Sequence, residues 1–124
     1  MASAEGRRRS ASETVIFHNP RCSTSRKTLE LLRDNGHEPT VIQYLKTPPT
    51  RAELEKLIAD AGVSVRTAVR TREALYAELG LGEASDDELL DALAEHPVLI
   101  ERPFVVTAKG TRLARPVDAV REIL

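Results

Sequence analysis

Residues 14–27 read TVIFHNPRCSTSRK, and the fold expected for the chain is built on this segment. Its apolar run, Val15-Ile16-Phe17, is bounded by turn-forming residues and predicts a buried strand. A short loop follows, and a helix is expected from Ser23 until Gly36 stops it. The stretch therefore indicates a strand, a loop and a helix, with the lone cysteine, Cys22, where the helix opens.

The middle of the chain is predicted to be a helical insert at about residues 50–96. Thr50 with Glu53, and Ser85 with Glu88, each fit the Ser/Thr-x-x-Glu pattern of a capping box, and leucines at helical spacing follow both. Two further short helices are expected between residues 64 and 79.

Strands are predicted on both sides of this insert. Residues 41–45 are β-branched and aromatic-rich, which favours a strand. Residues 104–106 and 111–113 predict two more strands around Lys109-Gly110, a hairpin turn signal.

A last helix is predicted to begin at Pro116, with Val117, Val120 and Leu124 on one face. The order is then β-α-β, a helical insert and β-β-α. This order predicts an α/β fold with a four-stranded mixed sheet flanked by helices.

Composition narrows the class of protein. The chain has 124 residues, 41% of them hydrophobic and 30% charged, which fits one globular domain. We expect a disordered leader at residues 1–13 and a single domain at residues 14–124. A formal net charge of -1 argues against nucleic-acid or membrane-surface binding. No apolar run approaches the roughly 20 residues of a membrane span.

The cysteine count limits the chemistry further. One cysteine permits no internal disulfide and excludes zinc sites built from several cysteines. No secretory signal is recognisable, so the cytoplasm is the expected compartment. No cluster of metal ligands stands out, and we expect neither a metal nor a bound cofactor.

Cys22 is a candidate nucleophile. A helix start offers unpaired backbone N–H groups and the positive end of the helix dipole, both of which lower a thiol pKa. No Asp or Glu occurs from residue 14 to residue 29, whereas His18, Arg21, Arg26 and Lys27 all lie there. These features predict a reactive sulfur beside an oxyanion cradle. The alternative is a cysteine that acts only as a small buried hydrophobic residue.

Several kinds of thiol chemistry are excluded by the neighbouring residues. Ser25 stands where a Cys-x-x-Cys dithiol would place its second cysteine, and Thr28 stands where a Cys-x5-Arg phosphatase loop needs arginine. A Cys/His hydrolase stays open through His18, His37 or His96. Any redox turnover must take its second thiol from another molecule.

Five motifs carry a family resemblance: HNPRCSTSR at 18–26, YLKTPP at 44–49, YAELGL at 76–81, HPVLIERP at 96–103 and GTRLARP at 110–116. With them, the chain from about residue 14 to residue 124 resembles the glutaredoxin-linked arsenate reductases, the ArsC family. The resemblance implies a thioredoxin-like fold.

The resemblance also implies roles for particular residues. Cys22 matches the family's nucleophile, His18 the histidine thought to keep it ionised, and Ser25 the serine beside the thiol. Asn19 lies in the same loop and is expected to contact the substrate, and Pro103 falls where thioredoxin-like proteins hold a cis proline. The three oxyanion-binding arginines of the family fall on Arg70, Arg102 and Arg115.

Guanidinium chemistry independently suits that last assignment, because arginine offers planar, permanently charged, bidentate donors to multiply charged oxyanions. Arg102 and Arg115 both stand within apolar surroundings in the sequence, where a merely solvated charge is unusual. For each, an ion pair with a helix carboxylate is the alternative. Arg70 has the weakest local support, because a cation is favoured at the end of a helix in any case.

The implied activity is arsenate reduction by Cys22, completed by an external thiol such as glutathione and by glutaredoxin or an equivalent reductant. A monomer is expected. Two alternatives stay open: a protein of thiol repair or glutathionylation that uses the same loop, and a non-enzymatic redox regulator of the same fold that binds RNA polymerase.

Overall fold

The computed structural model describes residues 14–124, so the predicted leader at residues 1–13 lies outside the described residues. The described chain forms two compact units. One contains residues 14–43 and 102–124, and the other, residues 44–101, contains the predicted helical insert. The single-domain boundary of 14–124 stays a prediction.

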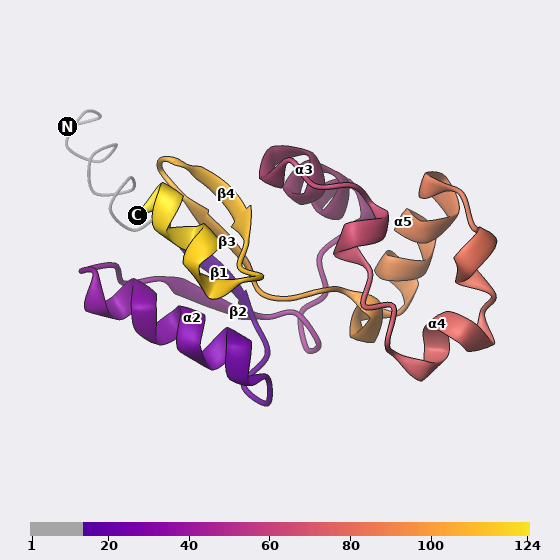
Figure 1. Ribbon diagram of the computed structural model, residues 1–124, viewed down its shortest axis with the longest axis horizontal. Helices are drawn as coiled ribbons and strands as arrows, with labels where there is room; N and C mark the ends of the chain where they lie inside the picture. The colour runs from indigo at the N-terminus through magenta and orange to yellow at the C-terminus, as the bar shows by residue number, and fades with distance from the viewer. Residues whose placement is uncertain (1–13) are drawn as a thin grey trace. The chain divides into compact units, whose positions relative to one another are not determined.

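The first unit is built on a four-stranded mixed sheet, as predicted (Figure 1). Its order is β2-β1-β3-β4, with β1 parallel to β2 and antiparallel to β3, and β3 antiparallel to β4. The strands are β1 (Val15–His18), β2 (Thr40–Gln43), β3 (Phe104–Thr107) and β4 (Gly110–Leu113). Helix α2 (Ser23–Asp34) connects the parallel pair, because parallel neighbours need such a crossover.

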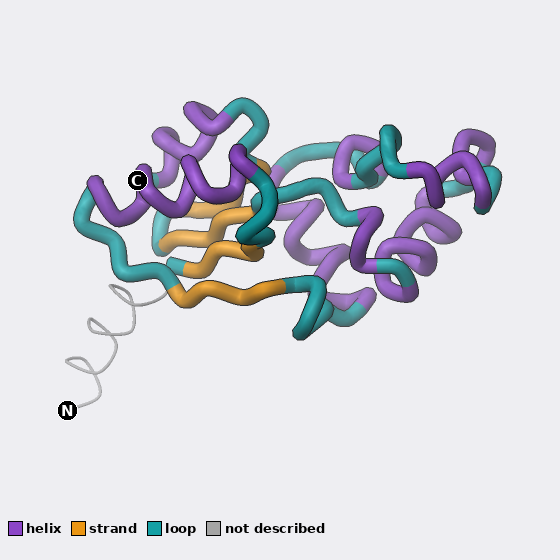
Figure 2. Tube along the Cα trace, turned by 90° about the horizontal axis from the view of Figure 1, so that it is seen from below, coloured by secondary structure: helices purple, strands orange, loops and turns teal. Residues whose placement is uncertain are grey.

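The core of this unit lies between the sheet and two helices, α2 and the 3-10 helix η4 (Val117–Ile123). Ile16 and Val105 are register partners on β1 and β3, and both are buried against Leu32 of α2 and Val120 of η4. Figure 2 shows the two helices on one side of the strands. The sheet and α2 thus fix the position of the loop between β1 and α2.

The last helix differs from its prediction. Val120 and Ile123 are buried, whereas Leu124, which the prediction placed on the inner face, is only partly buried. The cause is the 3-10 conformation, whose three residues per turn put positions three apart, and not seven apart, on one side. Pro116 is the N-cap residue and not the first residue of the helix.

Strand boundaries also shift. The second strand is Thr40–Gln43 and not residues 41–45, and Gln43 pairs with His18, the last residue of β1. The hairpin turn lies at residues 108–109, and Gly110 already belongs to β4. Pairing partners, which local sequence does not reveal, decide both boundaries.

The second unit is helical. Its longer helices are α3 (Arg51–Ala61) and α5 (Asp86–Glu95), which pack against each other, with α4 (Ala74–Glu78) and the 3-10 turns η1 (Arg66–Ala68), η2 (Leu81–Glu83) and η3 (Pro97–Leu99). Both predicted capping boxes are confirmed, on Thr50 and on Ser85. The leucines of α3 and α5 are buried as their spacing predicts. Within residues 14–124, none of the helices combines the length and apolar character that a membrane crossing needs.

Candidate active site

Cys22 is the N-cap residue of α2 and stands four positions after His18, the last residue of β1. Its N–H donates to the Asn19 carbonyl at 3.0 Å, which closes the loop, and its carbonyl accepts from the Arg26 N–H at 3.0 Å, which starts the helix. The side chain is partly exposed. The first turn of α2 carries no acidic residue, so nothing there opposes the positive field of the helix start.

The surroundings of the Cys22 sulfur lower its pKa. Burial is the largest single influence and acts in the opposite direction, because a partly buried thiolate loses hydration. Hydrogen bonding from the Ser25 backbone N–H, the hydrogen bond and charge of Arg102, and the Thr24 backbone N–H together outweigh it. The site therefore favours the thiolate, which is the nucleophilic form of cysteine.

Ser25 organises the loop that presents the thiol. Its buried Oγ lies 2.7 Å from His18 Nδ1 and accepts the Asn19 N–H at 3.0 Å. The Asn19 side chain in turn accepts the Arg21 N–H at 3.0 Å through Oδ1, as in an Asx turn. These contacts give Ser25 and Asn19 a structural task in the loop, and the roles implied by the family resemblance stay predictions.

His18 is buried at the end of β1, and its pKa is lowered. Burial is the main cause, and the charges of Arg33 and Arg26 add to it. Because an ordinary histidine titrates near 6.5, His18 is mainly neutral at pH 7. Any support that it gives to the thiolate at that pH passes through its hydrogen bond to Ser25, whose backbone N–H faces the sulfur.

Arg102 and Arg115 come together in the same unit as the thiol. The Arg102 side chain hydrogen-bonds the Cys22 sulfur, although the residue is only 8% exposed. Arg115 Nη1 donates to the Arg102 carbonyl at 3.1 Å. Each of these arginines precedes a proline through a cis peptide bond, Arg102–Pro103 and Arg115–Pro116.

Arg70 belongs to the other unit. Its backbone N–H donates to the Leu99 carbonyl at 2.7 Å, beside the antiparallel bridge between Val69 and Ile100. Its side chain is mostly buried and pairs with Glu73, with 3.4 Å between Nε and Oε2. The ion pair that was the alternative for this arginine is thus present, and its place at an oxyanion stays a prediction.

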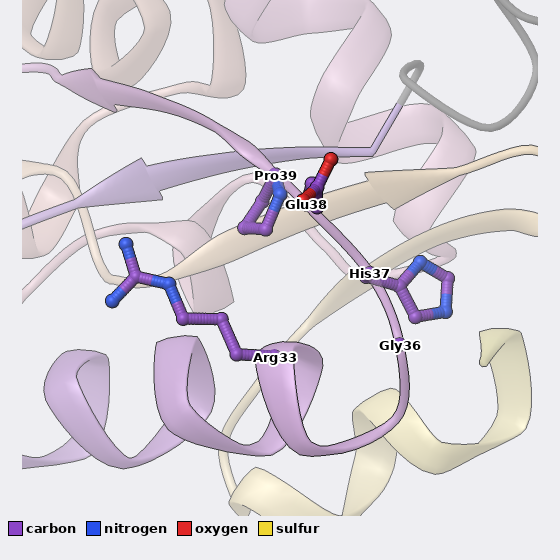
Figure 3. A pocket seen from close by; sticks show the side chains of 5 residues that line it. All are labelled: Arg33, Gly36, His37, Glu38 and Pro39. Atoms are coloured by element: carbon purple, nitrogen blue, oxygen red, sulfur yellow. The ribbon is translucent and has the colours of Figure 1, made fainter.

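A pocket of about 470 Å³ lies at the other end of α2 and is not the thiol site (Figure 3). It is lined by Arg33, Gly36, His37, Glu38 and Pro39. The helix that separates it from Cys22 has 12 residues, which corresponds to about 18 Å along its axis. In Figure 3 the side chains of Arg33 and His37 extend in different directions, and His37 Nδ1 lies 2.8 Å from Thr14 Oγ1. We assign this pocket no function.

The backbone N–H groups that act on the sulfur are those of Thr24 and Ser25, at the helix start where the sequence predicts such groups. One feature of the site has no local signal in the sequence. It is the cis bond before Pro116, since cis bonds make up only about 5–6% of X–Pro bonds in folded proteins.

The fold and the site together define a class. The mixed sheet β2-β1-β3-β4, with α2 and η4 packed on it, is a thioredoxin-like fold. A single thiol occupies the N-cap of its first helix, and an arginine hydrogen-bonds the sulfur. The protein is therefore a thioredoxin-like protein with one activated cysteine.

Comparison with known proteins identifies the family. The model of the ArsC family matches residues 17–123. An arsenate reductase of Rhizobium meliloti (strain 1021) is 60% identical over 112 residues, covering 89% of this chain and 80% of that protein. An arsenate reductase of Escherichia coli (strain K12) is 57% identical over 115 residues, covering 91% and 82%. The solved structure of an arsenate reductase from Vibrio cholerae superposes with a TM-score of 0.85 at 51% identity, covering 90% of this chain and 97% of that one. The chain belongs to the ArsC family.

Proposed function

We propose that this protein is an arsenate reductase in which the Cys22 thiolate is the nucleophile. The observation that carries the proposal is the sulfur itself, held at the N-cap of α2 with its pKa lowered and with Arg102 hydrogen-bonded to it. The identity of 57–60% to arsenate reductases over most of the chain supports the choice of arsenate among oxyanions.

In the first step, the thiolate attacks the arsenic of dihydrogen arsenate. An S–As bond forms, an As–O bond breaks, and the leaving oxygen takes up a proton and departs as water. The adduct is a cysteinyl arsenate that still contains As(V). Arg102 assists because the positive charge of its guanidinium offsets the repulsion between two anions.

In the second step, a thiol from outside attacks the Cys22 sulfur of the adduct. The S–S bond of a mixed disulfide forms, the S–As bond breaks, and its electron pair stays on arsenic, which leaves as arsenite, As(III). A second external thiol then reduces the mixed disulfide and restores the Cys22 thiol. Two thiols are oxidised to one disulfide for each arsenate reduced. No bound cofactor takes part in this sequence.

The remaining residues have supporting roles in the proposal. Arg115 joins Arg102 in holding the oxyanion, since it already contacts the Arg102 backbone, and Arg70 supplies the third guanidinium. Ser25 and Asn19 keep the loop in shape, and neutral His18 fixes Ser25. Asn19 lies in the same loop as the thiol, and its predicted role is to contact the substrate.

The reductant is proposed to be a low-molecular-weight thiol such as glutathione, followed by glutaredoxin or a similar protein. With a single cysteine the chain holds no second thiol of its own. We propose the cytoplasm as the compartment, because a free thiol persists under reducing conditions. A monomer suffices in this proposal, since every group described at the sulfur comes from the same chain.

The test is arsenite release. Purified protein is incubated with arsenate, glutathione and glutaredoxin, and arsenite is measured by speciation chromatography. Release is expected from the wild-type protein and not from Cys22→Ser. Arsenite formation at equal rates by both proteins would refute the proposal, and activity on mixed disulfides with arsenate untouched would favour thiol repair.

A further inference from the structure

Two stretches of the second unit pair directly before Arg102. An antiparallel bridge joins Val69 to Ile100, flanked by backbone hydrogen bonds of 2.7 and 2.8 Å. One of the bridged stretches ends at Glu101, the residue bonded to Arg102. The other continues through Arg70. The bridge therefore fixes the backbone immediately before the arginine that hydrogen-bonds the thiol.

An ion pair between Arg72 and Glu101 also joins these two stretches. Arg72 Nη1 donates to Glu101 Oε2 at 3.3 Å, and the side chain of Glu101 is only 10% exposed, against 51% for Arg72. A carboxylate at that depth is costly unless hydrogen bonds or a cation compensate it. Arg72 stands two residues beyond Arg70, so the bridge and the ion pair hold the same short length of backbone.

We propose that the Arg72–Glu101 ion pair is a positioning pair that sets where Arg102 meets the Cys22 sulfur and the oxyanion. As regards the oxyanion, the inference rests on the proposed function. One peptide bond separates Glu101 from Arg102, and a small rotation there moves the end of the long arginine side chain by much more. On its other side, Arg102 is fixed through its carbonyl by Arg115 at 3.1 Å.

Positioning and bulk charge make different predictions, and three variants separate them. If Arg72 and Glu101 act only through charge, Arg72→Gln weakens oxyanion binding, Glu101→Gln strengthens it, and the double variant returns to the wild-type value. If they act as a positioning pair, both single variants and the double variant weaken binding to a similar extent, because either change already breaks the pair.

Two readouts on Cys22 decide between these outcomes. The first is the arsenate concentration that halves the rate of Cys22 alkylation by iodoacetamide, which we expect to rise about fivefold in all three variants. The second is the pH midpoint of alkylation without arsenate, which we expect to move upward in the double variant as Arg102 leaves the sulfur. If the ion pair only stabilised the fold, neither readout would change in variants that are still folded. Circular dichroism checks that each variant is folded.

The matched control is a second ion pair of the same unit. Lys56 Nζ and Asp60 Oδ2 lie 2.7 Å apart on α3, and the double variant Lys56→Gln/Asp60→Asn is expected to match the wild type in both readouts. The swapped pair Arg72→Glu/Glu101→Arg is expected to recover part of the loss.

Shifts of opposite sign in the two single variants, or a double variant that matches the wild type, would overturn the positioning role. The pH midpoint requires no turnover and no arsenate. It therefore tests the pair even if the wild-type protein fails to release arsenite, a result that would refute the proposed function alone.

Discussion

Replacing Arg102 by glutamine should slow the reaction of Cys22 with an alkylating agent at neutral pH. Among the described residues that lower the pKa of Cys22, Arg102 contributes both a side-chain hydrogen bond and a positive charge. Glutamine keeps a hydrogen-bond donor of shorter reach and removes the charge. The change therefore addresses the electrostatic part of the interaction.

The expected magnitude follows from the geometry of a close ion pair. Two unit charges about 4 Å apart interact by about 4 kcal/mol at an effective dielectric constant of 20 and by about 1 kcal/mol in bulk water. Arg102 is buried but the sulfur is partly exposed, so solvent screens part of the interaction. We expect about 1–2 kcal/mol, or roughly a tenfold fall in the thiolate population on the acid side of the midpoint.

The assay is the rate of iodoacetamide modification from pH 5 to pH 10, followed by mass spectrometry. The single cysteine makes the signal unambiguous. Arg102→Gln should shift the midpoint to higher pH, and Arg102→Lys, which keeps the charge, should shift it less. Arg121→Gln is the control, since Arg121 is an exposed arginine of the same unit that pairs with Asp118. An unchanged or lowered midpoint in Arg102→Gln would show that Arg102 does not stabilise the thiolate.

Three further predictions concern stability. Ser25→Ala removes the partner of His18 Nδ1 and of the Asn19 N–H, so the free energy of unfolding in urea should fall by about 1–3 kcal/mol, and a loss below 0.5 kcal/mol would contradict the network. Thr50→Ala removes the side-chain half of the capping box with Glu53 and should cost about 1 kcal/mol in the same assay with alkylation of the thiol unaffected, whereas a slower alkylation would contradict its purely structural role. Burial, aided by two nearby arginines, lowers the pKa of His18, so as the pH falls this histidine is protonated in the unfolded chain before it is protonated in the folded one. The free energy of unfolding should therefore be full above about pH 6.5 and fall below it. His18→Asn should lose less stability than the wild type between about pH 7.5 and pH 5.5.

Local sequence predicts those parts of the fold that local physics determines. The capping boxes at Thr50 and Ser85 are present because each needs only a hydroxyl and a glutamate three residues apart. The predicted end of the second strand was wrong. Tyr44 has strand propensity, but the pairing of β1 with β2 ends at His18 and Gln43 and does not extend to Tyr44. A strand's end depends on a neighbour far along the chain, which no window of residues contains.

The site divides in the same way. Cys22 at the start of a helix is predictable from the apolar run before it and the hydroxyl residues after it. The approach of Arg102 to the sulfur is not, because the two residues are 80 positions apart in the chain and the pairing of β1 with β3 brings them together. The family resemblance pointed to Arg102 as an oxyanion ligand, which stays a prediction; the structure shows its side chain hydrogen-bonded to the Cys22 sulfur.

A moderately lowered pKa suits Cys22 as a nucleophile better than a strongly lowered pKa would. A thiolate of lower pKa is a weaker nucleophile, with a Brønsted coefficient of about 0.4–0.5, so a tenfold gain in ionised fraction costs about threefold in intrinsic reactivity. The gain ends once the pKa reaches the ambient pH, and further stabilisation then only lowers reactivity. Burial, which raises the pKa, opposes the Ser25 N–H and Arg102, which lower it. In the proposed reaction Arg102 would also offset the charge of the incoming oxyanion, so its contribution would persist in the step where two anions must meet, whereas the N–H groups act on the sulfur.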